Sequence, residues 1–217
     1  LLRAHRRAAR RPGVGLMQLL VASNNPKKLK ELHTILAEAG IEGVELVPLS
    51  EAEPYPEPVE DGRTCADNAL IKARAGAKAT GLPCVADDSG LAIEELNGMP
   101  GVLSARWSGR HGDDAANNEL LLGQLAHVPE ERRSAAFVSV CVLVTPAGQE
   151  HVVEGRWPGR VLTAPRGEGG FGYDPLFQPE GEECSAAEMT PEEKNAVSHR
   201  GQALWQLVPV VAALQKN

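Results

Sequence analysis

Two adjacent carboxylates, Asp87 and Asp88, stand at the end of a short apolar run over residues 83–86. Such a run predicts a buried strand. Carboxylates at the end of a buried strand are costly to desolvate unless something compensates their charge. Ligands of α/β folds also tend to bind at this edge of the sheet. The segment is therefore a candidate binding or catalytic site, and the alternative is a polar turn in which Asp and Ser bond locally.

Three more carboxylates gather just upstream of this run: Glu60, Asp61 and Asp67. A helix expected over residues 64–80 is roughly 25 Å long, and the strand after it returns over about 16 Å. The chain thus comes most of the way back, and we expect Asp88 to lie close to Glu60 and Asp67. Converging carboxylates suit Mg²⁺, and Lys72 could contact a phosphate at the same site. Acidic residues near a helix start also stabilise the helix dipole, which is the alternative for part of this cluster.

A polar loop joins an expected strand, residues 17–22, to a segment with helical periodicity, residues 29–39. It consists of Ser23, Asn24, Asn25, Pro26, Lys27 and Lys28. Backbone amides at a helix start, together with Ser, Asn and Lys side chains, can cradle a phosphate. The loop lacks the spacing of a P-loop. The alternative is a capped helix start whose lysines lie on a solvated face.

Glycines bracket an aromatic residue in the sequence GGFGYDP. There the backbone can approach a flat ligand that stacks on Phe171, while Asp174 accepts a hydrogen bond from a base. Further along the chain, Lys194 precedes a pair, His199 and Arg200, that could offer donors to a keto group or a phosphate. The alternatives are a purely structural aromatic turn and a helix cap with two exposed basic residues.

The remaining pattern predicts an α/β fold with a mixed sheet. Periodicity and turn residues indicate a strand over 44–49, a helix over 113–126, strands over 135–145 and 150–157 that form a hairpin, a short strand near Leu176, and a final helix over 201–214. Thr64 and Asp67 form a capping box at the start of the helix over 64–80. Pro209 is expected to bend or interrupt the last helix.

Composition limits the class of protein and its partners. The 217 residues carry a net charge of −7, and setting aside the five arginines of residues 1–16 leaves 17 basic against 29 acidic residues, or −12. This acidity argues against a nucleic-acid surface. Four widely spaced cysteines predict reduced thiols and argue against a zinc site. No apolar run reaches the roughly 18 residues of a membrane span, so we expect no membrane partner and a cytoplasmic protein.

Residues 1–16 are basic and lack the apolar stretch and cleavage site of a secretory signal. The ordered pattern begins at Met17. We therefore expect a disordered N-terminal extension, residues 1–16, followed by a single domain, residues 17–217.

Six stretches resemble the inosine triphosphate pyrophosphatase family, the non-canonical purine nucleoside triphosphate diphosphatases. They are SNNPKKLKEL (23–32), EDGxTxxDNAxxKA (60–73), ADDSGL (86–91), PGVLSARWSG (100–109), GGFGYDPLF (169–177) and EEKNAVSHRGQAL (192–204). Each stretch alone is a weak signal, but the ordered set is highly specific and spans nearly all of residues 17–204. Residues 1–16 lie outside the resemblance.

The resemblance implies an elongated, two-lobed α/β fold in which helices flank a central mixed sheet and a nucleotide cleft lies between the lobes. It also implies Mg²⁺ as cofactor, a homodimer, and hydrolysis of ITP, dITP or XTP to the monophosphate and pyrophosphate. Asp88 would be the general base and, with Glu60, a metal ligand. The implied substrate contacts are Ser23, Asn24, Asn25, Pro26, Lys27, Lys28 and Lys72 for the triphosphate, Ser89, and Phe171, Gly172, Tyr173, Asp174, Lys194, His199 and Arg200 for the base.

Two positions depart from the usual pattern of the family. Asp67 stands where Glu is commoner, and Ser23 and Asn24 stand where a glycine or a Thr-Gly pair is common. Two alternative functions stay open: a related pyrophosphatase that prefers another base, including modified pyrimidines, and a nucleotide-binding regulator without turnover. The crowded carboxylates argue against the regulator, because a polyphosphate binder gains little from them without a metal.

Overall fold

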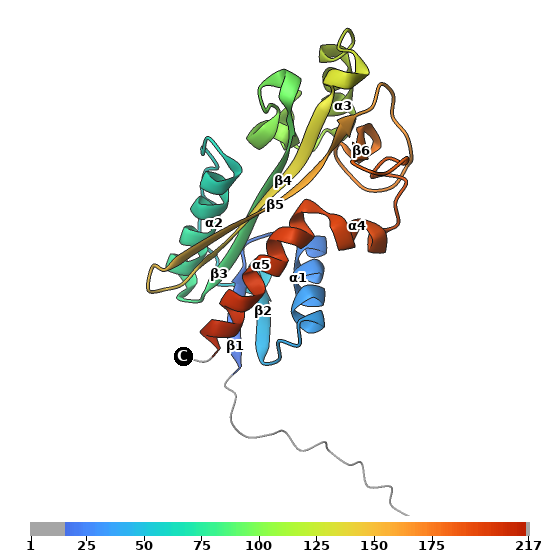
Figure 1. The fold of residues 1–217 in the computed structure, drawn as a ribbon. Coiled ribbons are helices and arrows are strands. Elements are labelled where there is room, and N and C mark those ends of the chain that lie inside the picture. The colour runs from blue at the N-terminus through green and yellow to red at the C-terminus, as the bar shows by residue number, and fades with distance from the viewer. Residues whose placement is uncertain (1–15, 216–217) are drawn as a thin grey trace, which may run out of the picture.

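The computed structural model describes residues 16–215, apart from the side chain of Asn195, and shows an elongated α/β fold (Figure 1). One mixed sheet has the strand order β2-β1-β3-β4-β5-β6. The strands are β1 (Met17–Val21), β2 (Val44–Pro48), β3 (Cys84–Ile93), β4 (Ser134–Val144), β5 (Glu150–Val161) and β6 (Phe177–Pro179). The α-helices are α1 (Pro26–Glu38), α2 (Cys65–Thr80), α3 (Asp114–Gln124), α4 (Pro191–Val197) and α5 (His199–Leu214).

The expected basic extension lies outside the described residues, except for Leu16. Across the part of the chain that the structure describes, every helix is too short or too polar to cross a membrane.

The sheet is parallel at one end and antiparallel at the other, as the predicted mixture of βα units and a hairpin requires. β1 pairs in parallel with β2 and β3, whereas β3, β4, β5 and β6 pair antiparallel in turn. Parallel neighbours need a crossover connection. α1 follows β1 and α2 precedes β3, so these two helices make the crossovers and are placed beside the central strands.

Local capping fixes the start of α2. The hydroxyl of Thr64 accepts a hydrogen bond from the Asp67 amide at 3.1 Å, and the Asp67 carboxylate accepts one from the Thr64 amide at 3.0 Å. This is the predicted capping box, which is confirmed. Gly81 ends the helix with φ +69°, the left-handed conformation that glycine tolerates best.

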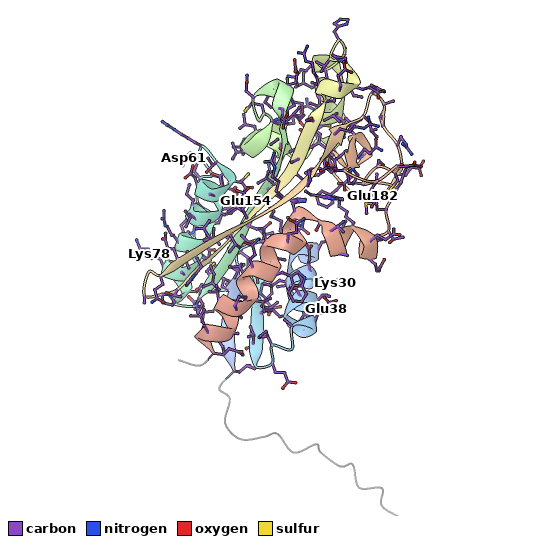
Figure 2. All side chains as sticks on the ribbon, viewed as in Figure 1. Lys30, Glu38, Asp61, Lys78, Glu154 and Glu182 are labelled. Atoms are coloured by element: carbon purple, nitrogen blue, oxygen red, sulfur yellow. The ribbon has the colours of Figure 1, made fainter. Side chains whose placement is uncertain are left out.

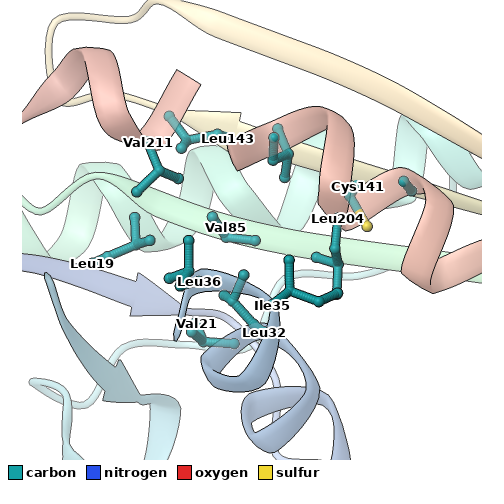
Figure 3. Close-up of a cluster of buried hydrophobic side chains, with 12 residues drawn as sticks. Leu19, Val21, Leu32, Ile35, Leu36, Val85, Cys141, Leu143, Leu204 and Val211 are labelled. Carbon is teal, nitrogen blue, oxygen red and sulfur yellow. The ribbon is translucent and has the colours of Figure 1, made fainter. Parts of the chain in front are cut away.

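The apolar core divides into two lobes joined by the long strands β3, β4 and β5. In the first lobe α1 and α5 cover one sheet face over a cluster that includes Leu19 and Leu204 (Figure 3), and α2 packs small side chains such as Ala73 on the opposite face. The second lobe has its own cluster, which includes Phe137 and Phe177. The middle of β3 lies between these apolar cores. Its side chains therefore need not pack into either core and can be polar.

Two strands are longer than predicted. We expected the strand to end at Asp87, but β3 continues to Ile93 because β4 pairs with it along its whole length. β5 likewise continues past Trp157 to Val161. Hydrogen bonds to the neighbouring strand keep the residues at the predicted ends within the strands. Such pairing between distant segments cannot be predicted from the local sequence.

The C-terminal helices also differ from the prediction. Ser198 ends α4 and caps α5, its hydroxyl accepting from the Gly201 amide at 3.2 Å, so α5 begins at His199. Pro209 lies inside α5 without interrupting it. Leu207 and Val211, on either side of the proline, are fully buried, and this packing holds the helix together where propensity alone would end it.

The first turn of α5 lies directly on the backbone of β5 at Gly155. A Cβ atom added there would come within 1.9 Å of the His199 carbonyl oxygen and 2.8 Å of the Ala203 nitrogen. Only a residue without a side chain allows this approach. Gly155 therefore sets the position of the α5 N-terminus and of the side chains that it carries.

We expect Gly155→Ala to lower the free energy of unfolding by about 1–3 kcal/mol or more, because the methyl group must displace α5. Gly123→Ala in α3 is the matched control. Its added Cβ meets no atom within 4 Å, and alanine favours a helix by up to about 1 kcal/mol over glycine. Urea unfolding of both variants measures the difference, and equal midpoints for Gly155→Ala and the parent protein would contradict this packing.

Candidate active site

Asp87 and Asp88 lie in the middle of β3 and point to opposite faces of the sheet, since side chains alternate along a strand. Asp87 shares its face with α1 and α5, and Asp88 shares its face with α2, as their partners show. The two neighbouring carboxylates therefore belong to two different electrostatic environments. We did not predict this division, because we expected the strand to end at Asp87.

Asp88 lies in the acidic cluster predicted from the sequence. Its carboxylate accepts a hydrogen bond from Asn68 Nδ2 at 3.3 Å, and its other oxygen lies 4.0 Å from Lys72 Nζ. The same ammonium lies 3.1 Å from Glu60 Oε2. All three ionic side chains are largely buried. The structure thus brings Glu60, Lys72 and Asp88 together, in the arrangement expected from the out-and-back path of the chain.

The other members of the predicted cluster are elsewhere. Asp67 is exposed and its carboxylate is used by the helix cap, where it also accepts from the Arg63 amide at 3.1 Å. These hydrogen bonds, chiefly from Thr64, lower the pKa of Asp67. Asp61 is exposed at the same end of α2 (Figure 2). Asp67 therefore stabilises the start of the helix, which was the alternative role. Its carboxylate makes its hydrogen bonds there and not with Asp88.

Asn68 is a site residue that the sequence reasoning missed. It is 1% exposed, and its Oδ1 accepts from the Gly62 amide at 2.9 Å while its Nδ2 donates to Asp88. One amide thereby joins the loop that carries Glu60 to the middle of β3. Its position four residues before Lys72, on the same face of α2, was the available signal.

Burial raises the pKa of the Asp88 carboxyl, although the Lys72 ammonium and the Asn68 hydrogen bond oppose the shift. Burial also raises the pKa of the neighbouring Cys65 thiol to about 12, with the Asp88 charge adding to the effect. Cys65 is therefore an uncharged neighbour of the site at neutral pH. The charge of Asp88 is thus coupled to that of the nearby Lys72 ammonium.

Asp87 is the centre of a buried ionic network. Its Oδ2 lies 2.8 Å from Lys28 Nζ and 2.9 Å from an Arg200 guanidinium nitrogen, and Arg200 also lies 3.6 Å from Glu31. Burial opposes ionisation of Asp87, but the two cations outweigh it and hold the pKa of that carboxyl well below its usual range. The sequence predicted Lys28 and Arg200 as substrate contacts and did not predict that Asp87 pairs with both.

The loop before α1 is folded on itself. Ser23 Oγ accepts from the Asn25 amide at 3.1 Å, and Asn25 Oδ1 caps the helix by accepting from the Lys27 amide at 2.9 Å. Pro26 occupies the first helical position. The capped helix start is therefore present, and the predicted role in triphosphate binding rests on Asn24 and on the lysines.

A hollow of about 210 Å³ lies beside this loop. Its lining includes Asn24 on one side, Tyr55 and Pro58 on another, and Lys72 from α2. Two predicted phosphate contacts, Asn24 and Lys72, thus face the same space. Lys72, which pairs with Glu60 and lies 4.0 Å from Asp88, connects this hollow to the two carboxylates.

The aromatic turn presents Phe171, whose side chain is 54% exposed. Lys194 Nζ lies 4.7 Å and Lys27 Nζ 5.7 Å from the centre of its ring. Asp174 is 2% exposed and accepts hydrogen bonds from the Phe171 amide at 2.8 Å and from Lys194 Nζ at 2.5 Å. The predicted base acceptor Asp174 is thus engaged in shaping the turn.

Three predicted contacts have unexpected surroundings. Tyr173 is buried and its hydroxyl donates to the Ser104 carbonyl at 2.9 Å, so its side chain does not face a ligand. Gly172 has both its backbone amide and its carbonyl bound to side chains of α3. Ser89 is half-buried in β3, on the face of Asp87.

His199 and Arg200 are buried, so the alternative of an exposed basic pair is wrong. The His199 ring stacks on Phe137, with ring centres 5.1 Å apart, and its Nδ1 is buried without a hydrogen-bond partner among the described residues. Burial, with the charges of Arg200 and Lys194, lowers the pKa of His199 to about 3. His199 is therefore a neutral imidazole with hydrogen-bonding capacity to spare.

Within residues 16–215, the structure contains no group of three or more His, Cys, Asp or Glu side chains arranged to hold a metal ion. Glu60 and Asp88 supply two carboxylates, both next to Lys72. A metal held there would need further oxygen ligands from water or substrate, as is common for Mg²⁺.

The chain belongs to the Ham1 family, whose model matches residues 19–210. It is 70% identical over 201 residues to the dITP/XTP pyrophosphatase of Corynebacterium diphtheriae, covering 90% of this chain and 97% of that one. It is 59% identical over 197 residues to that of Mycobacterium tuberculosis, covering 91% and 96%.

Solved structures agree with the family assignment. The crystal structure of the nucleoside-triphosphatase, or dITP/XTP pyrophosphatase, of Mycobacterium abscessus is 64% identical in sequence and has a TM-score of 0.78, covering 90% of this chain and all of that one. A HAM1 protein from Coxiella burnetii is 41% identical with a TM-score of 0.84, covering 91% and 99%. The resemblance found in the sequence is confirmed.

We expect Asp87→Asn to cost about 3–5 kcal/mol of stability at neutral pH, because it leaves two buried cations without their partner. The pKa of Asp87 is lower in the folded state than in the unfolded state. Its contribution is therefore complete above the unfolded pKa of about 4 and is lost as the pH falls below that value.

Urea unfolding of the parent protein and the variant at pH 6, 4 and 3 measures this effect, with the exposed Asp61→Asn as control. The stability difference should shrink toward pH 3 for Asp87→Asn and stay near zero for the control. A difference that is constant with pH would contradict the depressed pKa.

Proposed function

We propose that this protein hydrolyses non-canonical purine nucleoside triphosphates, dITP, ITP, XTP and dXTP, to the monophosphate and pyrophosphate. It would thereby remove deaminated purine nucleotides before polymerases use them. The observation that carries the proposal is 70% identity, over 90% of the chain, to a dITP/XTP pyrophosphatase. The cluster of Glu60, Lys72 and Asp88 gives that activity a plausible chemical centre.

Glu60 and Asp88 fit a divalent cation. Their two carboxylates share one ammonium, so the cluster holds net negative charge in a largely buried place. Hard oxygen ligands of this kind are those that Mg²⁺ prefers. When bound, Mg²⁺ would neutralise phosphate charge and make a water easier to deprotonate. Glu60 and Asp88 would hold it, and Lys72 would exchange its carboxylate partners for a phosphate oxygen.

Asp88 would act as the general base. The carboxylate would take a proton from a water that attacks the α-phosphorus, so that the new O–P bond forms as the bond between the α-phosphorus and the bridging oxygen breaks and pyrophosphate leaves. A base is most effective when its pKa lies close to the working pH, and burial moves the pKa of Asp88 upward. Asn68 would aim the carboxylate through its hydrogen bond.

Substrate orientation would come from both lobes. Asn24 and Lys72 line the hollow beside the α1 loop and would align the triphosphate, together with Lys27 from the first turn of α1. Phe171 would stack on the purine from the opposite lobe, with Lys194 beside its ring. These contacts would hold the phosphoanhydride between them, near Asp88.

Selectivity for a 6-keto purine would depend on His199. Its imidazole is neutral and has an unpartnered nitrogen, so it can donate to a 6-keto oxygen, whereas adenine presents an amino group, itself a donor, at that position. A buried donor left unpaired can give large discrimination. Arg200 follows His199 in the chain, but its guanidinium is already paired with Asp87 and Glu31. Guanine shares the keto group, and its rejection must involve its 2-amino group.

We also propose that the protein is a homodimer, as the family resemblance implies. Light scattering on the purified protein tests this, and a mass of 23.1 kDa, that of one chain, would contradict it.

Pyrophosphate release from dITP, XTP, dGTP and dATP, each with Mg²⁺ and with EDTA, tests the function. We expect fast turnover of dITP and XTP only, and only with Mg²⁺. Turnover of all four nucleotides would keep the pyrophosphatase and reject keto-purine selectivity. Turnover of none would overturn the proposed reaction.

Asp88→Asn should lower kcat for dITP by about 10²–10⁴-fold, the usual contribution of a general base. Binding of dITP should persist, because the asparagine keeps the shape of the side chain. Asp61→Asn, an exposed neighbour of the cluster, is the matched control and should keep the parental rate. An unchanged rate for Asp88→Asn would remove Asp88 from the mechanism.

A further inference from the structure

Helix α3 holds the aromatic turn through both backbone polar groups of one residue. The Gly172 amide donates to Asp114 Oδ2 at 2.7 Å, and Asn118 Nδ2 donates to the Gly172 carbonyl at 2.8 Å. Asp114 and Asn118 are four residues apart, on one face of α3. We call this pair of hydrogen bonds the α3 clamp.

The cap of α3 is made without the clamp residues. Asp113 is the N-cap, and its carboxylate accepts from the Ala116 amide at 3.1 Å. Asp114 is thus free to reach across to a segment 58 residues away in the chain. Asn118 reaches across as well, although its Oδ1 is buried without a hydrogen-bond partner among the described residues. Burying this oxygen without a partner costs free energy. The hydrogen bond from Nδ2 to the Gly172 carbonyl offsets that cost and explains why an amide stands at this position.

Packing holds Tyr173, which is buried in the second lobe, whereas polar contacts hold Gly172. Behind it lies a hollow of about 350 Å³ lined by residues that include Leu122, Pro165 and Pro175. Gly172 itself has φ +61°, which glycine adopts most readily. The turn therefore has a residue of high backbone freedom at its centre, and the clamp restrains that residue.

The residue before the clamp is Phe171. Its amide is held by Asp174 on one side, and the next residue is held by α3 on the other. The ring itself is 54% exposed. An exposed ring stays in one orientation only if its backbone is fixed, and a platform that is fixed before a ligand arrives spares the entropy of ordering it.

We propose that Asp114 and Asn118 are positioning residues for base recognition: through Gly172 they hold the Phe171 ring in the orientation that stacks on the purine. This rests on the proposed function, in which Phe171 is the stacking residue. The clamp acts on the base and not on the phosphates, because Asp114 and Asn118 belong to the lobe that carries Phe171, whereas Lys72 and Asn24 belong to the other.

The test compares Asp114→Ala, Asn118→Ala and the double variant with the parent protein. We expect KM for dITP and Kd for dIMP to rise about three- to tenfold in each single variant, and about ten- to thirtyfold in the double variant. A tenfold change corresponds to about 1.4 kcal/mol. The kcat should stay within about twofold, because the clamp strengthens ground-state and transition-state binding alike.

Two comparisons separate base recognition from a general loss of structure. The inhibition constant of inorganic tripolyphosphate, which has no base, should not change. Asp114→Asn should restore the parental KM, because its side-chain oxygen can accept from the Gly172 amide. Glu119→Ala, an exposed neighbour on α3, is the matched control and should behave as the parent protein.

Parental KM and Kd values in the double variant would overturn the proposal, as would parallel increases in KM and in the tripolyphosphate inhibition constant. If Asn118→Ala does not fold, Asn118→Asp keeps the shape and removes the donor, and it should raise KM in the same way. A parent protein that does not turn over dITP would refute the proposed function instead, and dIMP binding would then test the clamp by itself.

Discussion

The need to keep two carboxylates ionised in the middle of a long strand shapes the rest of this structure. Asp87 and Asp88 lie in β3 between two apolar cores, where desolvation raises the cost of their charge. Each is compensated from a different direction. α1 and α5 bring two cations to Asp87, and α2 brings an amide and an ammonium to Asp88. Helices therefore cover both faces of the sheet. On each face they carry polar side chains that compensate one of the two carboxylates.

The two environments have different consequences. The Asp87 network is closed, because its cations neutralise it and link α1, β3 and α5. It can hold the first lobe together without a ligand. The Asp88 cluster is not balanced, since two carboxylates share Lys72. A cluster with excess negative charge attracts a cation, which is why we propose metal binding and catalysis there, while the Asp87 network supports the framework behind it.

Short-range signals in the sequence were sufficient for much of the fold. The capping box of Thr64 and Asp67 and the hairpin of β4 and β5 were predicted correctly, because local hydrogen bonds and turn geometry determine them. Strand ends were predicted less well. β3 passes through Asp87 because β4 pairs with it, and α5 passes through Pro209 because its neighbours are buried. Both outcomes depend on contacts between distant segments.

The sequence by itself determined the family, the α/β fold, and the meeting of Glu60, Lys72 and Asp88, since helix and strand lengths fix how far the chain travels before it returns. Tertiary structure alone decided the partners of Asp87 and the charge state of His199. Strand alternation turned Asp87 away from Asp88 and toward Lys28. Burial made His199 neutral. The clamp of α3 on Gly172 joins residues far apart in the chain, and such pairing follows from the packed positions of elements, which no local pattern encodes.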